Sequence, residues 1–228
     1  MPDNIQPATK PNVLSEFDSK ELLRKAGIPV IETRLAHSKT EVVAISKEIG
    51  FPVVLKIASP DVIHKSDAGG VKVGLSNAAQ AGRAYSEIIA SVKEKFPDAF
   101  VEGVSVQKMA RPGIEIIIGM SKDPQFGPVL MFGLGGIMVE IIKDVAFRII
   151  PLTRSDAAEM IREIKGYKLL EGFRGREAAD IKSLEEMILH VSEFVLRNPQ
   201  IKELDINPVL AYKDGVIAVD ARIVLEPS

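Results

Sequence analysis

The segment 59–70 contains side chains that can bind a phosphoryl group or react with it. Its residues are Ser-Pro-Asp-Val-Ile-His-Lys-Ser-Asp-Ala-Gly-Gly. The imidazole of His64 is mostly neutral at physiological pH, because its ordinary pKa lies near ~6.5, and a neutral imidazole can attack phosphorus. Gly69 and Gly70 permit close approach of the backbone to a ligand. A surface loop in which His64 only forms a hydrogen bond would look the same, so both interpretations stay open at this point.

A lysine interrupts an otherwise apolar run. Residues 53–57 are Val-Val-Leu-Lys-Ile, a pattern typical of a short buried strand. Lys56 either lies at the strand end, where its ammonium group reaches water, or points at an anion in a cleft. The run by itself favours the first interpretation.

Oxygen-bearing side chains line up near the C-terminus. Acidic and amide residues alternate there with apolar ones, so Asp205 and Asn207 share one face of a strand. We expect a two-residue turn at Asp214-Gly215 that closes a hairpin. In that register Asn207 lies opposite Arg222 and diagonal to Asp220, and their oxygen atoms suit Mg²⁺. A half-solvated sheet face is the alternative, and a three-residue loop would turn Asp220 to the other face.

The overall composition is that of a globular protein and excludes several classes. Of 228 residues, 46% are hydrophobic and 26% are charged. A net charge of −2 and 5% aromatic residues supply neither the positive charge nor the stacking surface that nucleic-acid binding requires. Without cysteine there is no disulfide, thiolate catalysis or cysteine-ligated metal. No signal peptide or membrane-spanning segment is visible, so we expect a cytoplasmic protein without membrane attachment.

The predicted elements indicate an α+β (α/β) fold with two lobes, because strands and helices do not alternate as in a Rossmann sheet. Residues 1–14 are expected to be a flexible tail and residues 15–226 a single domain, with an N-terminal lobe of about 15–109 and a C-terminal lobe of about 110–226. Helices are predicted to begin at or near Ser15, Ser38, Asn77, Ser155 and Ser183. Strands are predicted at about 53–57, 71–74, 101–109, 114–120, 129–132, 138–142, 146–150, 201–212 and 216–225.

Three segments resemble characteristic segments of the beta subunit of ADP-forming acetyl-CoA synthetases, which are ATP-grasp proteins related to the beta chain of succinyl-CoA synthetase. They are residues 59–71, 132–140 and 203–209. The likeness extends from about Glu16 to Leu225, and the His-Lys-Ser-Asp-Ala-Gly-Gly run is its most specific part. The resemblance implies an ATP-grasp fold in which nucleotide binds in the cleft between two lobes.

The resemblance also implies roles for particular residues. His64 resembles the histidine that receives phosphate from a partner-subunit histidine and passes it to ADP, and Asp205 is expected to support it. Lys56 resembles the lysine that contacts nucleotide phosphates, and Asn207 and Asp220 match two magnesium ligands. Gly69 and Gly70 match the glycine loop that covers the phosphates. Gln107, Lys108 and Met109 match the hinge that contacts adenine, and Glu115 matches the acidic residue near the ribose.

The implied activity is that of an ADP-forming acetate–CoA ligase. The family reaction reversibly converts acyl-CoA, ADP and phosphate into carboxylate, CoA and ATP, with Mg²⁺, an acyl phosphate and a phosphohistidine. The CoA-binding part belongs to an alpha subunit, so the resemblance implies an alpha2beta2 assembly. A nucleotide-sensing module without turnover and a carboxylate–amine ligase are the other interpretations. The combination of His64, Lys56, Asn207 and Asp220 argues against the first, and the loop histidine argues against the second.

Overall fold

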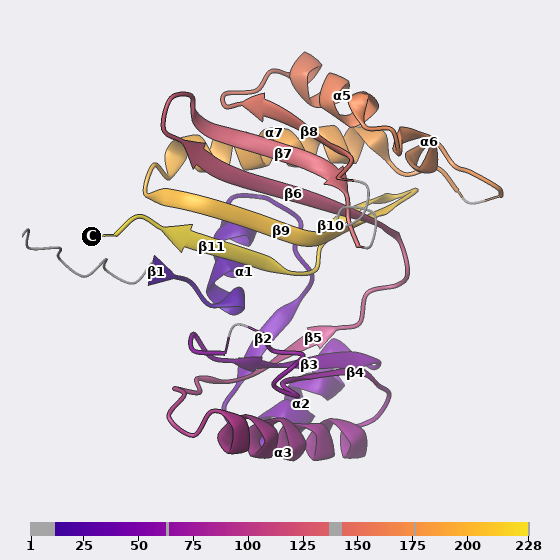
Figure 1. Cartoon of the computed structure of the whole chain (residues 1–228). Coiled ribbons are helices and arrows are strands. Elements are labelled where there is room, and N and C mark those ends of the chain that lie inside the picture. Colours follow the sequence, from indigo (N-terminus) through magenta and orange to yellow (C-terminus); the bar gives the residue numbers. More distant parts are fainter. Residues whose placement is uncertain (1–11, 63, 137–142, 176, 228) are drawn as a thin grey trace, which may run out of the picture.

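A computed structural model describes residues 12–62, 64–136, 143–175 and 177–227. Within these ranges the chain forms two antiparallel sheets, and each sheet with its helices makes one lobe (Figure 1). The predicted strand at 138–142 lies outside the described residues. No helix in these ranges combines the length and the apolar character that crossing a membrane would require.

The smaller lobe is a four-stranded sheet in the order β2-β5-β3-β4, with two helices packed against it. Its elements are β2 (Thr33–Ala36), α2 (Lys39–Ile49), β3 (Val53–Ala58), β4 (Val71–Leu75), α3 (Ala78–Lys95) and β5 (Gly103–Lys108). Apolar side chains such as Val42, Leu55 and Ile88 fill the core between helices and sheet. The central strand β3 is buried along all six residues, so Lys56 stands on a rigid support.

The larger lobe has a sheet in the order β1-β11-β9-β6-β7-β8, and β10 pairs with β9. Its strands are β1 (Asn12–Val13), β6 (Ile114–Asp123), β7 (Gly127–Leu134), β8 (Val145–Ile149), β9 (Ile201–Tyr212), β10 (Gly215–Ala218) and β11 (Ala221–Leu225). Its helices are α1 (Glu16–Lys25), α5 (Arg154–Glu163), α6 (Tyr167–Leu170) and α7 (Ile181–Arg197). The core lies between these helices and one sheet face, with Phe132 and Met160 fully buried. The opposite face carries Phe147, which is 54% exposed.

The N-terminal helix packs into the larger lobe, not the smaller one. Leu23 and Ile28 belong to the core of the larger lobe, and Val13 of β1 pairs with Val224 of β11. The predicted tail at 1–14 therefore overlaps β1 at Asn12 and Val13. The predicted N-terminal lobe at 15–109 includes α1, which packs in the larger lobe instead. The amphipathic pattern of α1 identifies an apolar face, but it contains no information about which of two sheets that face covers.

Three of the four predicted capping residues cap the starts of their helices. The side chains of Ser15, Ser38 and Asn77 accept backbone N–H groups at the starts of α1, α2 and α3. The predicted cap at Ser155 is wrong, because Thr153 caps α5 and forms a reciprocal capping box with Asp156. The Thr153 hydroxyl accepts the Asp156 N–H, and the Asp156 carboxylate accepts the Thr153 N–H. A helix that began at Ser155 would not have this pair of hydrogen bonds.

The C-terminal hairpin has its turn one residue earlier than predicted. Tyr212 pairs with Gly215, so the turn consists of Lys213 and Asp214. Moving a two-residue turn by one position changes the pairing of the strands by two residues, and an even shift leaves every side chain on its original face.

The new register changes the partners of the oxygen-bearing residues. Arg222 lies opposite Asp205, and the backbone N–H of Asn207 donates to the backbone carbonyl of Asp220 at 3.2 Å. The prediction that Arg222 lies opposite Asn207 is wrong. The prediction of a common face is unaffected by the even shift, and the tighter register places Asn207 directly across from Asp220.

The capping correction can be tested by comparing two neighbouring hydroxyl residues. We expect Thr153→Ala to lower the free energy of unfolding by about 1 kcal/mol, the usual contribution of a side-chain N-cap. Ser155→Ala should change it by less than about 0.5 kcal/mol, because Ser155 is exposed within the first turn. Urea unfolding followed by circular dichroism measures both values. Equal effects of the two substitutions, or a larger effect at Ser155, would contradict the assigned cap.

Candidate functional site

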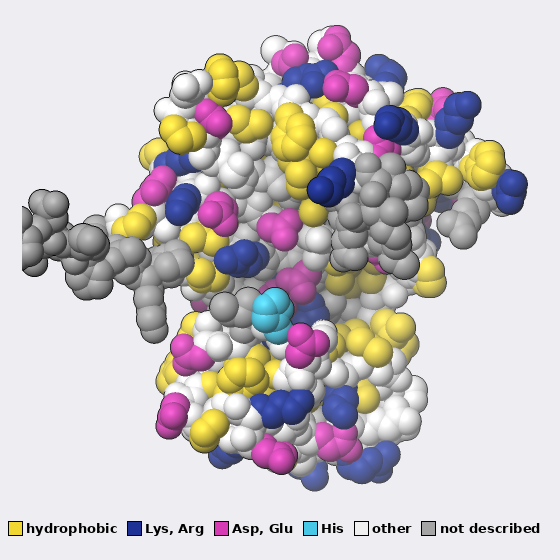
Figure 2. All heavy atoms as spheres, viewed as in Figure 1, with side chains coloured by type: hydrophobic (Ala, Val, Ile, Leu, Met, Phe, Trp, Pro, Cys, Tyr) yellow, Lys and Arg dark blue, Asp and Glu magenta, His cyan; other side chains and the backbone are white. Residues whose placement is uncertain are grey.

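The two lobes enclose a cleft with a volume of about 980 Å³. It is lined by the start of α1, the strand β3 and the loop after it, β9, and the connection from β10 into β11. Five of the predicted site residues line this cleft: Lys56, His64, Asp205, Asn207 and Asp220. The space-filling view shows a histidine side chain at the boundary between the lobes, beside basic and acidic side chains (Figure 2).

Lys56 connects the two lobes through its ammonium group. Its Nζ donates to Glu16 Oε1 and to Asp220 Oδ2, both at 2.7 Å. Burial lowers the pKa of Lys56, but the carboxylates of Glu16 and Asp220 outweigh this effect, so its pKa lies above the ordinary value. The side chain is therefore charged and points into the cleft, as the second interpretation of the sequence proposed.

Glu16 is the centre of a buried network of ion pairs. Its Oε1 also accepts from Lys20 at 2.8 Å, and its Oε2 accepts from Lys65 at 2.7 Å. Burial raises the pKa of Glu16, but the ammonium groups of the three lysines together hold it well below its usual range. Lys20 in turn donates to Gln107 Oε1 at 2.6 Å. The carboxylate thus remains ionised and holds the ammonium groups of three lysines close together.

The loop between β3 and β4 presents His64 to the cleft. Its first part is held by Ser59 Oγ, which donates to the Phe100 carbonyl at 2.6 Å, and by Asp61 Oδ2, which accepts from the Phe100 N–H at 2.8 Å. The His64 side chain is exposed. Within the described part of the chain, no hydrogen bond occupies its imidazole nitrogens, so these atoms are accessible to a phosphoryl group.

The two glycines that end this loop are explained by packing. Gly69 has a positive φ of 70°, and a Cβ there would lie 2.5 Å from Ser91 Oγ. A Cβ at Gly70 would lie 2.6 Å from a methyl group of Ile57. Neither glycine lines the cleft in the described structure. Their nucleotide contact therefore stays a prediction, while their role in closing the loop onto the smaller lobe has a direct steric reason.

Asp205, Asn207 and Asp220 bring oxygen atoms to one side of the cleft. Burial raises the pKa of Asp205, Arg222 opposes this rise, and the nearby carboxylate of Asp220 adds to it. Burial is the largest of these effects, so the Asp205 carboxylate is partly withdrawn from water. The second oxygen of Asp220, Oδ1, is separate from the Oδ2 that accepts from Lys56.

This donor set fits magnesium bound together with phosphate. Mg²⁺ commonly takes one or two carboxylates and completes its octahedral shell with phosphate oxygens and water. Among the described residues, no group of three or more His, Asp or Glu side chains could hold a metal ion. Two carboxylates and one amide therefore suit a metal that arrives with a nucleotide better than a permanent structural metal.

The other predicted nucleotide contacts lie away from this cleft. Lys108 Nζ donates to the Gly50 carbonyl at 2.9 Å, and Lys108 and Met109 line a separate hollow of about 330 Å³. Gln107 is buried, accepts from Lys20 and does not line the cleft. Glu115 is exposed at the start of β6. The described structure does not bring these residues together with His64.

Sequence reasoning missed Glu16. An acidic residue directly after the capping residue Ser15 is common, because it complements the helix dipole. Lys20, four residues later, completes an ordinary helical ion pair. Neither feature predicts a contact with Lys65, which lies 49 positions away in sequence. The only available signal was the clustering of Glu16 with Lys20 at a helix start.

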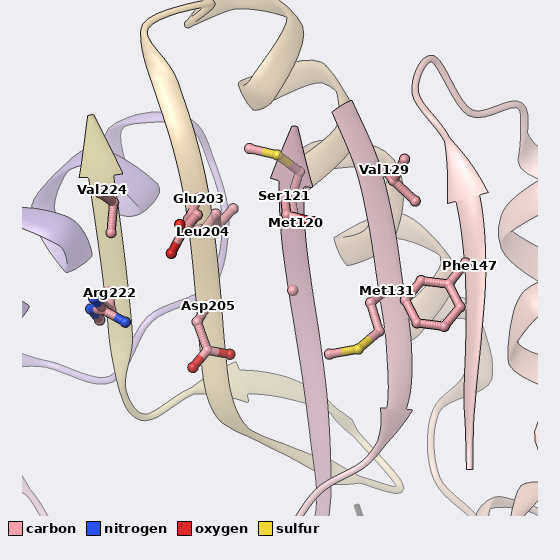
Figure 3. A pocket seen from close by; sticks show the side chains of 11 residues that line it. Met120, Ser121, Val129, Met131, Phe147, Glu203, Leu204, Asp205, Arg222 and Val224 are labelled. Atoms are coloured by element: carbon pink, nitrogen blue, oxygen red, sulfur yellow. The ribbon is translucent and has the colours of Figure 1, made fainter. Parts of the chain in front are cut away.

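Another hollow, of about 270 Å³, lies on the face of the larger sheet opposite its helices (Figure 3). Met131 and Phe147 lie on β7 and β8, while Asp205 and Arg222 lie on β9 and β11 (Figure 3). Asp205 and Arg222 line both this hollow and the cleft. Only the cleft, of these two, is also lined by His64, Lys56 and Lys65, the groups that phosphoryl chemistry requires. We therefore assign the site to the cleft.

The chain is similar in sequence and in fold to known proteins of one family. The family model of the ATP-grasp domain matches residues 7–225. The beta subunit of acetate–CoA ligase [ADP-forming] I of Pyrococcus furiosus is 52% identical over 212 residues, which are 93% of this chain and 91% of that protein. Acetate–CoA ligase [ADP-forming] I of Archaeoglobus fulgidus is 47% identical over 90% of this chain, which spans only 30% of that longer protein.

Solved structures of acetyl-coenzyme A synthetase 1 of Ca. Korarchaeum cryptofilum have the same fold. One, in complex with coenzyme A and Ca-AMPCP, matches with a TM-score of 0.91 at 51% identity, covering 94% of this chain and 93% of that chain. Another, with coenzyme A and Mg-AMPPCP, has its phosphohistidine segment pointing towards the nucleotide binding site and matches with a TM-score of 0.84 at 48% identity, with the same coverage. This chain therefore belongs to the ATP-grasp family, among the beta subunits of ADP-forming acetate–CoA ligases.

Proposed function

We propose that this chain is the nucleotide-binding beta subunit of an ADP-forming acyl-CoA synthetase and that His64 carries the phosphoryl group transiently. One observation carries the proposal: an accessible histidine shares a cleft with a charged lysine and a set of oxygen ligands. The enzyme would form carboxylate, CoA and ATP from acyl-CoA, ADP and phosphate. Relatives with this activity and with bound Mg-nucleotide analogues support the assignment.

The proposed step at His64 is a phosphoryl transfer between two nucleophiles. In the direction of ATP formation, a terminal oxygen of the ADP β-phosphate attacks phosphorus on the imidazole. A P–O bond forms, the P–N bond breaks, and its electron pair returns to the ring nitrogen of His64. Lys56 would stabilise negative charge on the transferred group, because fixed positive charge near phosphorus lowers the barrier.

Asp205, Asn207 and Asp220 would hold the magnesium ion beside the phosphates. When bound, Mg²⁺ neutralises negative charge on phosphate oxygens and fixes their orientation. The structural reason for this assignment is the convergence of two strands on the cleft, with Asn207 across from Asp220. Asp205 would also support the imidazole of His64, as the family resemblance implies. Nucleotide contacts of Gly69, Gly70, Gln107, Lys108, Met109 and Glu115 belong to the same proposal.

A second chain would supply the CoA-binding site and the acyl phosphate. The relative from Archaeoglobus fulgidus is much longer than this chain, and the relative from Pyrococcus furiosus is named as a subunit. The name of the second relative, of which this chain covers 91%, supports an alpha subunit as partner. We propose an alpha2beta2 assembly in the cytoplasm, with His64 accepting phosphate from a histidine of the alpha subunit.

Two other functions fit the site less well. A nucleotide sensor without turnover would not need an accessible histidine in the same cleft as charged Lys56. A carboxylate–amine ligase transfers phosphate directly from ATP to a carboxylate, so a histidine carrier would have no role in it. The geometry of His64 separates both from the proposed ligase.

The carrier role predicts a large effect of removing the imidazole. We expect His64→Ala to reduce ATP formation from acetyl-CoA, phosphate and Mg-ADP by at least about 10³-fold, the order expected when a covalent nucleophile is lost. The assay combines this chain with the alpha subunit and also measures acid-labile phosphate on each chain. His190→Ala, an exposed histidine on α7, is the matched control and should behave like the wild type. ATP formation by His64→Ala at the wild-type rate would overturn the carrier role.

The magnesium assignment predicts a binding defect that depends on the metal. We expect Asn207→Ala and Asp220→Asn each to weaken binding of Mg-ADP by at least about tenfold, which corresponds to about 1.4 kcal/mol. Isothermal titration calorimetry with and without EDTA measures the effect. Asp214→Asn changes an exposed carboxylate in the turn of the same hairpin and serves as the control. An equal loss with and without Mg²⁺ would contradict the assignment.

The assembly can be checked by mass. Native mass spectrometry of this chain mixed with its alpha subunit should show two copies of each chain, the even stoichiometry expected of a closed symmetric oligomer. A complex with one copy of each chain would contradict alpha2beta2 without affecting the assignment of His64.

A further inference from the structure

One buried carboxylate connects the loop that carries His64 to the lysine at the centre of the cleft. Lys65 donates to Glu16 Oε2, and Lys56 donates to Glu16 Oε1, both at 2.7 Å. The Glu16 side chain is only 6% exposed. Because each lysine uses a different oxygen of the same rigid group, the spacing between the loop and Lys56 is set by the carboxylate.

Glu16 itself is held firmly in the larger lobe. It is the first residue of α1, whose start is capped by Ser15. Lys20 of the same helix contacts its Oε1, and Leu23, one turn further on, is fully buried in the core of the larger lobe. The carboxylate is therefore attached to the larger lobe by contacts that do not involve the loop.

The remaining hydrogen bonds of the loop go to the smaller lobe. Ser59 and Asp61 bind the backbone of Phe100, and Lys95 donates to the Asp67 carbonyl at 2.7 Å. Among the described residues, the ion pair from Lys65 to Glu16 is the one hydrogen-bonded contact of this loop with the larger lobe. That lobe also carries Asp205, Asn207 and Asp220. The pair thus determines how His64 lies relative to these groups.

We propose that Glu16 is a positioning residue for phosphoryl transfer, which acts through Lys65 to hold His64 over the nucleotide phosphates. The inference rests on the proposed function, in which His64 exchanges a phosphoryl group with nucleotide. Transfer requires the ring nitrogen, phosphorus and the departing oxygen to lie nearly in line. A loop attached only to the smaller lobe would not hold His64 in register with ligands on the larger lobe.

The cleanest test removes the loop side of the ion pair. Lys65→Met keeps the length of the side chain and leaves Glu16 paired with Lys20 and Lys56, whereas a change at Glu16 would leave three buried or partly buried lysines without their shared carboxylate. Lys65→Arg keeps the charge and the reach. Lys72→Met, which removes a partly exposed ion pair with Glu87 on the same lobe, is the matched control.

The chemical experiment uses this chain in complex with its alpha subunit, without CoA. Saturating Mg-ATP labelled at the γ-phosphate is added, and acid-labile label on this chain is followed in time. For Lys65→Met we expect transfer slower by about tenfold to a hundredfold, the order that a displacement near 1 Å produces. The dissociation constant of Mg-ATP should change by less than about threefold, because the lost contact orients the reacting group rather than binding the nucleotide. Lys65→Arg should restore the rate, and Lys72→Met should leave it unchanged.

Hydrogen exchange of the peptide that covers the His64 loop gives a second, independent measurement. Exchange should rise in Lys65→Met and stay at the wild-type level in Lys72→Met and Lys65→Arg. Wild-type transfer by Lys65→Met would overturn the positioning role, whether or not exchange rises. Slower transfer that Lys65→Arg does not rescue would also overturn it. Absence of label on the wild-type chain would instead overturn the proposed function, and the exchange data would still show whether the ion pair holds the loop.

Discussion

The ammonium group of Lys56 is buried between two lobes, and this charge needs partners that the smaller lobe does not provide. An isolated buried charge is strongly unfavourable unless it is paired. Glu16 from α1 and Asp220 from the connection between β10 and β11 supply the carboxylates, and both belong to the larger lobe. The cleft therefore forms where the charge of one lobe meets the counter-charges of the other. Its chemistry and the contact between the lobes depend on the same ion pairs.

The supporting elements separate the fixed groups of the site from His64, the proposed phosphate carrier. Lys56 lies on the fully buried strand β3 and Asp205 on the twelve-residue strand β9, and Asn207 and Asp220 face each other in the pairing between strands. Groups that stabilise charge work best when they are already oriented. His64, in contrast, lies on a loop with its imidazole exposed. The proposed exchange of phosphate with two partners requires such access, and in our proposal the contact of Lys65 with Glu16 sets the distance of His64 from the fixed groups.

Much of this arrangement could be predicted from local sequence. The caps at Ser15, Ser38 and Asn77 place three helices, since a capping side chain acts within three residues of its own position. The common face of Asp205 and Asn207 follows from the two-residue period of a strand. The exact register did not follow, because a turn at Lys213-Asp214 and one at Asp214-Gly215 are both acceptable locally. Only the pairing of β9 with two following strands decides between them.

By itself, the sequence determined the ATP-grasp family, the histidine loop, the lysine on β3 and the polar strand face, because each of these is encoded within a short stretch of chain. The tertiary structure decided which lobe holds α1, and with it the position of Glu16 beside Lys65 and Lys56. It also showed that Gly69 and Gly70 pack against Ser91 and Ile57 rather than lining the cleft. Ion pairs between residues 40 to 164 positions apart depend on how two sheets are packed together, and no local pattern of residues specifies that packing.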